Sequence, residues 1–182
     1  MPERTDITPH ELAQLLAYNP DTGLLTWLQR DRKWCINDRD HARWNSRHAG
    51  KEALTCVGKL GYKSGHVLSR IVKAHHAAWA LYYGEWPSGV IDHIDHDKTN
   101  NRISNLRVVS QAENNKNSSK RLDNSSGVTG VSPRDGKWRA RINVNGKRVN
   151  LGTFACIDDA IAARKNAEIM FGFHENHGKD GR

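Results

Sequence analysis

The sequence predicts an α+β protein in which two compact modules follow an N-terminal extension. Three observations support this prediction: short β-forming runs, capped segments with apolar residues at helical spacing, and an Asn- and Ser-rich stretch between the modules. We expect five parts in chain order: an extension over 1–72, a first module over 73–119, a linker over 120–126, a second module over 127–175 and a tail over 176–182.

The N-terminal extension is expected to open with a capped helix. Thr8 can cap this helix, Pro9 suits its first position, and Glu11, three residues after the cap, completes a capping box. The helix should end near Tyr18, and the turn-forming residues that follow lead into a strand over 24–28. Both elements are expected to serve as scaffold.

Residues 30–51 form a strongly charged segment. Seven of them are basic and three are acidic, and Trp34 and Trp44 are interleaved. We expect a basic loop that touches DNA phosphates and is docked by its tryptophans, or else a solvated loop whose tryptophans only pack on the body of the protein. Residues 59–72 should be β-rich, and alanines at helical spacing over 74–81 predict a helix.

The first module carries a strand, loop, strand, helix pattern. Residues 90–94 and 106–109 are short β-runs on either side of a polar, Asn-rich loop, so we expect a hairpin. Ser110 and Glu113 form a capping box, from which a short helix should begin at Gln111.

An Asp-His pair lies on the first of these strands, and two asparagines follow it. Asn105 and Asn114 lie 12 and 21 residues after His93, and Asn114 falls in the first turn of the helix. Asp92 and His93 are neighbours on a strand, so their side chains should point to opposite faces. A histidine of ordinary pKa can activate water near neutral pH, and carboxylate and amide oxygens suit a hard cation such as magnesium. The pattern is typical of phosphodiester hydrolysis. His96 is expected to be a solvated loop residue.

These residues resemble the HNH, or ββα-metal, endonucleases, particularly those of phages and of intron homing. The resemblance extends over 73–117, and an asparagine at the last motif position corresponds to the HNN variant. Matched by position, the resemblance implies that His93 is the general base and that Asn105 pins the loop. It implies that Asp92 and Asn114 are the metal ligands. It also implies one divalent cation, magnesium with manganese as the alternative. Asn115 and Asn117 stay open as replacements for Asn114.

The three cysteines do not form a metal-binding pair. Cys35, Cys56 and Cys156 are odd in number and lack the close spacing of a zinc knuckle, so we expect reduced thiols and no structural zinc. The sequence has no apolar run near 18 residues and no secretory signal pattern, so we expect a cytoplasmic protein without membrane contact. No small-molecule cofactor is expected.

The second module is predicted to contain three strands followed by a helix. From Trp138 to Val144, apolar and polar residues alternate, which predicts a strand with one apolar and one basic face. Asn145 and Gly146 predict a tight hairpin turn. An alanine-rich helix with acidic residues in its first turn should then cover the apolar face.

This second module resembles the DNA-binding domain of the plant ethylene-response factors. The matching residues are the Gly-Val at Gly130, the Trp-Arg-Ala-Arg-Ile run from Trp138, the Leu-Gly-Thr-Phe at 151–154 and the alanine-rich helix. The resemblance implies that the sheet enters the major groove of duplex DNA, where arginine can donate twice to guanine. The DNA contacts that it implies are Arg134, Trp138, Arg139, Arg141 and Arg148.

The net charge of +8 and the isoelectric point near 9.6 also favour a polyanionic partner. We therefore expect a metal-dependent endonuclease of double-stranded DNA, phage-encoded and homing-like. One alternative is a DNA-binding regulator or accessory protein whose nuclease core is inactive. Another is an RNA-binding protein of ribosomal type, which fits the charge but not the Asp-His-Asn arrangement. A monomer and a dimer both remain open.

Overall fold

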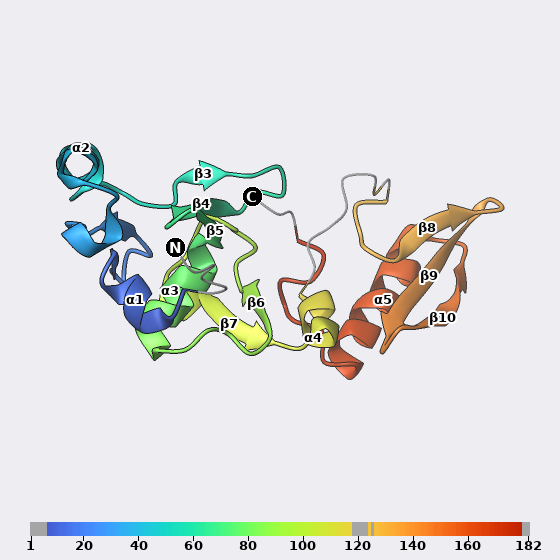
Figure 1. Ribbon diagram of the computed structural model, residues 1–182. Helices are drawn as coiled ribbons and strands as arrows, with labels where there is room; N and C mark the ends of the chain where they lie inside the picture. The colour runs from blue at the N-terminus through green and yellow to red at the C-terminus, as the bar shows by residue number, and fades with distance from the viewer. Residues whose placement is uncertain (1–6, 118–123, 125, 180–182) are drawn as a thin grey trace. The chain divides into compact units, whose positions relative to one another are not determined.

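The computed structural model describes residues 7–117, 124 and 126–179 (Figure 1). Within these ranges, helices are combined with two two-stranded and two three-stranded sheets, which confirms the α+β class. The described chain forms two compact units: residues 7–93 with 97–108, here called the N-terminal unit, and residues 94–96 with those from 109 onward, the C-terminal unit. Most of the expected linker and the last three residues of the expected tail lie outside the described ranges.

The first helix is shorter than expected. α1 spans Pro9–Ala13 and begins at the predicted capping box, in which Thr8 Oγ1 accepts from the Glu11 amide at 3.2 Å and the Glu11 carboxylate accepts from the Thr8 amide at 3.0 Å. The expected continuation beyond α1 is wrong, because Leu16–Tyr18 form strand β1 and pair antiparallel with β2, Leu25–Trp27. Tertiary pairing outweighs the weak local helix signal here.

The charged segment contains a helix where the sequence predicts a loop. A short 3₁₀ turn over Arg32–Trp34 leads to α2, Asp38–His48. The Asn37 side chain accepts a main-chain N–H of the first turn at 2.8 Å, and acidic residues in the first turn and basic residues in the last complement the helix dipole. None of the described α2 residues is buried, and Trp44 fixes the helix through an edge-to-face contact with Trp27 at 5.4 Å between ring centroids.

A three-stranded antiparallel sheet precedes the third helix of the N-terminal unit. Its strands are β3 (Cys56–Val57), β4 (Lys63–Val67) and β5 (Arg70–Lys73), in that order. α3, Ala74–Tyr83, follows directly. Its C-cap is Gly84, which adopts a left-handed conformation with a φ of +76° that favours glycine. The β-rich stretch and the alanine-spaced helix are both confirmed.

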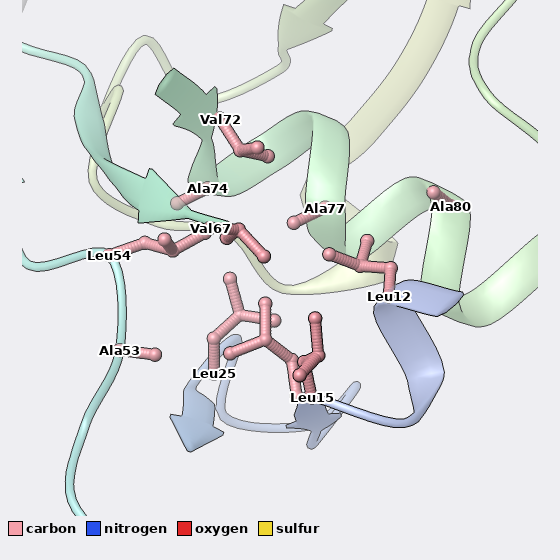
Figure 2. Packing of buried hydrophobic residues seen from close by; sticks show 11 residues of the cluster. Leu12, Leu15, Leu25, Ala53, Leu54, Val67, Val72, Ala74, Ala77 and Ala80 are labelled. Atoms are coloured by element: carbon pink, nitrogen blue, oxygen red, sulfur yellow. The ribbon is translucent and has the colours of Figure 1, made fainter. Parts of the chain in front are cut away.

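The core of the N-terminal unit is built by α1, α3, the β1-β2 pair and the sheet of β3 to β5. Figure 2 shows side chains from these elements pointing toward one another. Small alanines on the inner side of α3 leave room for leucines of α1 and β1, so the helix packs closely. The buried residues include Leu12, Leu15, Leu16, Leu25, Val67, Val72, Ala77 and Ala80.

The predicted strand, loop, strand, helix order is confirmed. β6 (Val90–His93) pairs with β7 (Leu106–Val109), and α4 spans Gln111–Lys116. The capping box at the start of α4 has the expected form: Ser110 Oγ accepts from the Glu113 amide at 3.2 Å, and the Glu113 carboxylate accepts from the Ser110 amide at 2.9 Å.

The C-terminal unit contains the predicted three-stranded antiparallel sheet packed on one helix. β8 (Val131–Arg134), β9 (Lys137–Val144) and β10 (Lys147–Phe154) lie in the order β10-β9-β8, and α5 spans Ile157–Met170. The β9-β10 turn uses the expected Asn-Gly pair, both residues with positive φ. The apolar face of the sheet packs on α5 through Val131, Ala140 and Ala160. No described helix is both long and apolar enough to span a membrane.

Candidate active site

Asp92 lies on β6 and is held by an arginine from β7. The aspartate is buried, and its Oδ2 accepts two hydrogen bonds from Arg107, from Nε at 2.9 Å and from Nη2 at 2.7 Å. Charge-assisted contacts of this kind fix the orientation of a carboxylate. Burial, and after it the charge of Asp92, raises the pKa of the Tyr62 phenol. Asp92 therefore presents an oriented negative charge within the N-terminal unit.

His93 is buried at the next position of β6 and has different neighbours. Its Nε2 lies 3.2 Å from Oδ1 of Asn101, and its ring meets that of His75 on α3 edge to face, with 5.1 Å between centroids. Burial, and after it the imidazoles of His76 and His93, lowers the pKa of His75 to about 2. His75 is thus neutral near pH 7. Tyr62 is a shared neighbour of the pair, since its ring centroid lies 5.8 Å from that of His93 and the charge of Asp92 acts on its phenol. The hydrogen-bond partners of Asp92 and His93 differ.

Asn105 lies at the end of the loop between β6 and β7 and is hydrogen-bonded to the middle of the same loop. It closes a 3₁₀ turn over Ile103–Asn105, is buried, and donates from Nδ2 to the Asn100 carbonyl at 2.9 Å. The following residue, Asn101, is also buried, and its carbonyl accepts from the Tyr18 hydroxyl at 2.7 Å. The loop that presents Asn101 to His93 is therefore held at two points.

Asn114 lies on α4, in the C-terminal unit, and is half-buried. The other two asparagines considered as metal ligands have different surroundings. Asn115 is exposed, and its Oδ1 accepts from a glutamine of the same helix at 3.2 Å. Asn117 is only 2% exposed, and its Oδ1 lies 3.0 Å from Nε2 of His96. Asn117 is thus engaged with a histidine.

Comparisons with known proteins bear on this segment. A family model described as HNH endonuclease matches residues 72–116, which hold Asp92, His93, Asn105 and Asn114. The chain carries an HNH endonuclease domain. An uncharacterized HNH endonuclease of Acanthamoeba polyphaga mimivirus is 33% identical over 91 residues, which are 50% of this chain and 47% of the viral protein. Protein 3.8 of Escherichia phage T7 is 33% identical over 81 residues, 43% of this chain and 67% of the phage protein.

The matched region thus spans about half the length of the mimivirus relative. No solved structure matches this chain.

Three residues that shape the HNH domain are absent from the sequence-predicted site. They are Asn101, Arg107 and His96. The expectation that His96 is solvated is wrong: it is buried, has a φ of +67° and contacts Asn117. One sequence signal could have indicated this contact, because His96 and Asn117 are 21 residues apart, the same spacing as His93 and Asn114. We find no comparable sequence signal for Asn101 or Arg107.

Outside the HNH domain, the sheet of the C-terminal unit has a basic face. Arg139 is paired with Thr153, Arg141 with Asn150 and Arg148 with Asn143, so the three arginines lie on the face opposite the buried Ala140 and Ile142. Arg134 is paired with Lys137 and lies on the same face as these three arginines. Desolvation, and after it the charges of Arg139, Arg148 and Arg134, lowers the pKa of Arg141. The arginines are therefore close enough to repel one another.

Trp138 lies on the other face of this sheet. It is half-buried and packs against the cluster of Val131, Ala140 and Ala160, beside α5. The alternation along β9 thus separates Trp138 from the arginines predicted to contact DNA alongside it.

A cavity of about 580 Å³ opens within the C-terminal unit. Its described lining contains four basic side chains and no acidic one, and it includes the aromatic ring of Phe173. The basic residues are Lys116, Arg141, Arg148 and Arg164. The positive surface of the sheet therefore continues to the end of α4.

Proposed function

We propose that this protein is a metal-dependent endonuclease that hydrolyses phosphodiester bonds of double-stranded DNA. The observation that carries the proposal is the buried Asp92-His93 pair inside the segment matched to HNH endonucleases. Each member of the pair has its own orienting partner, Arg107 for the carboxylate and Asn101 for the imidazole. Oriented acid-base and charge-bearing groups in one place are what hydrolysis of a phosphodiester requires.

His93 is the proposed general base. Its Nε2 lies 3.2 Å from the amide oxygen of Asn101, which accepts a hydrogen bond there and orients the ring. We assign His93 the task of taking the proton from the attacking water. Asn105 would support this geometry indirectly, because it holds the Asn100 carbonyl next to Asn101.

Asp92 and Asn114 are the residues that would hold the divalent cation. A carboxylate oxygen and an amide oxygen are the hard donors that magnesium prefers, with manganese as the alternative, so their chemistry fits such an ion. When bound, the cation would neutralise charge on the phosphate and on the leaving 3′ oxygen. The products would then carry 5′ phosphate and 3′ hydroxyl ends. Arg107 would keep the Asp92 carboxylate aimed in one direction.

The C-terminal unit is the proposed docking module for duplex DNA. Its sequence motifs resemble those of the ethylene-response factor domain, and the mutual repulsion of its arginines supports a polyanionic partner. We place Arg134, Arg139, Arg141 and Arg148 at the DNA. Trp138 we assign to the core of the unit, because it packs on the opposite face. In keeping with the viral relatives, we propose a phage-encoded, homing-like enzyme that acts in the host cytoplasm.

The proposal is tested with supercoiled plasmid and purified protein in magnesium or in EDTA. We expect nicking or linearisation in magnesium alone, and a loss of about 100-fold or more in rate for His93→Ala with unchanged DNA binding. The matched control is His66→Ala, since His66 is an exposed histidine of β4. Intact plasmid with wild-type protein in magnesium would favour the DNA-binding alternative. Full cleavage by His93→Ala would refute the assignment of the base.

A further inference from the structure

The segment that follows α5 turns back and is anchored in the C-terminal unit. We call residues 173–179 the C-terminal hook (Figure 1). His177 in this hook is buried, and its Nε2 lies 2.9 Å from Nη2 of the buried Arg164 of α5. Arg164 also donates to Glu168 at 2.9 Å and to the Arg141 carbonyl of β9 at 2.7 Å. The hook is therefore tied to both the helix and the sheet.

From this anchor the hook reaches the three residues that follow His93. Asn176 Nδ2 donates to the Ile94 carbonyl at 2.8 Å, although the two residues are 82 positions apart. Lys179 donates to Asn176 Oδ1, also at 2.8 Å. The oxygen of the Asn176 side-chain amide thus accepts from a cation, and its nitrogen donates to a main-chain carbonyl. These two contacts define the orientation of the amide.

The hook also holds α4, the helix that carries Asn114. The His174 amide of the hook donates to the Lys116 carbonyl at 3.3 Å. Just before the hook, the Phe171 carbonyl accepts from the Lys116 ammonium at 2.9 Å. The contact between His96 and Asn117 adds a second connection between α4 and residues 94–96.

We propose that Asn176 is a positioning residue of the nuclease site. By fixing the Ile94 carbonyl, it holds the main chain immediately after His93, and the rest of the hook holds the helix that bears Asn114. This inference rests on the proposed endonuclease function and extends it, because it makes a residue 60 positions beyond the matched HNH segment part of the catalytic geometry. Small displacements of a catalytic base cost large factors in rate.

The sharpest test is Asn176→Asp, which is nearly isosteric. The variant keeps an oxygen for Lys179 but replaces the N–H donor with a second oxygen facing the Ile94 carbonyl. Glu175→Gln is the matched control, because Glu175 is the exposed neighbour in the same hook. Three quantities are measured on full-length protein: kcat and KM for plasmid cleavage, and hydrogen exchange of the amides of residues 94–96 in metal-free protein.

We expect kcat of Asn176→Asp to fall about tenfold or more, KM to change less than about twofold, and exchange at residues 94–96 to become faster. Glu175→Gln should match wild type in all three. If Asn176→Asp does not fold, Lys179→Met is tested in its place. We expect this variant to lose less kcat and to show the same faster exchange at residues 94–96. A rise in KM at unchanged kcat would make Asn176 a DNA contact and overturn the proposal.

Unchanged hydrogen exchange at residues 94–96 would likewise overturn the proposal, because the contact between Asn176 and the Ile94 carbonyl would then not hold this segment in place. The exchange measurement needs neither metal nor DNA. A wild-type protein that leaves DNA intact would refute the endonuclease function, and with it the catalytic role of Asn176. Faster exchange in the variant would in that case still establish the contact, so the two failures are distinguishable.

Discussion

The Nε and Nη2 atoms of Arg107 both donate to one oxygen, Oδ2, of Asp92. The Asp92 side chain is 8% exposed and that of Arg107 34% exposed, so the pair spans the boundary between interior and solvent. The arginine supplies at this carboxylate the kind of charge that a divalent cation would also supply.

Replacing this arginine should therefore reveal whether Asp92 is a metal ligand. We expect Arg107→Met to lower the free energy of unfolding by about 1–2 kcal/mol, because a buried carboxylate loses a partner that is itself partly solvated. Magnesium should restore stability to the variant more than it stabilises wild type, since the cation replaces the lost positive charge. Urea unfolding with magnesium or EDTA measures both effects. An equal response of the two proteins to magnesium would contradict Asp92 as a ligand.

A second prediction concerns the partner of His93. Asn101→Ala removes the amide oxygen that faces Nε2, so the imidazole loses its orientation and its preferred tautomer. We expect kcat for cleavage to fall about tenfold with DNA affinity unchanged. Thr99→Ala is the control in the same loop, since the Thr99 hydroxyl donates to Asp97 at 2.7 Å rather than to the histidine. A selective change in DNA affinity would instead place Asn101 at the substrate.

The pH dependence of stability follows from His75. Its pKa is about 2 in the folded protein, against about 6.5 for histidine in an unfolded chain, so between these values the unfolded chain binds the extra proton. The contribution of the neutral His75 to the free energy of unfolding is therefore fully present above about pH 6.5 and is lost as the pH decreases. We expect His75→Gln to flatten this fall by up to about 1.4 kcal/mol per pH unit. Urea unfolding between pH 7.5 and 5 measures the slope, and identical slopes would show that His75 does not titrate on unfolding.

The basic face of the C-terminal unit predicts a salt dependence. Arg141→Gln should weaken DNA binding and reduce the slope of log affinity against log salt by about 1, because one phosphate contact is lost. Lys165→Gln is the control, since Lys165 lies on α5 and donates to Glu168 at 2.9 Å. Binding of a labelled duplex at several salt concentrations gives the slopes. Equal slopes for Arg141→Gln and wild type would remove Arg141 from the interface.

The features that the sequence predicted well depend on residues close together in the chain. The capping boxes at Thr8 and Ser110 each join residues three apart, and the turn between β9 and β10 needs only its own Asn-Gly pair. The alternation along β9 likewise shows which side chains share a face. Such signals are local, so they can be read without knowing the fold.

The contacts that were missed join distant residues. Arg107 and Asp92 are 15 positions apart, His96 and Asn117 are 21 apart, and Asn176 and Ile94 are 82 apart. Nothing in the local pattern says which arginine meets Asp92 or which asparagine meets a main-chain carbonyl. The α1 boundary failed for the same reason, because pairing of β1 with β2 decided it.

The chain passes into the C-terminal unit for residues 94–96 and returns to the N-terminal unit before leaving it again at residue 109. An exchange of coding segments downstream of the nuclease motif would therefore replace Asn176 while leaving its acceptor, the Ile94 carbonyl, behind. Under the proposed nuclease function, we expect recombinant descendants to cut DNA only when the incoming segment brings an equivalent side-chain amide, so that the two coding segments would be inherited together.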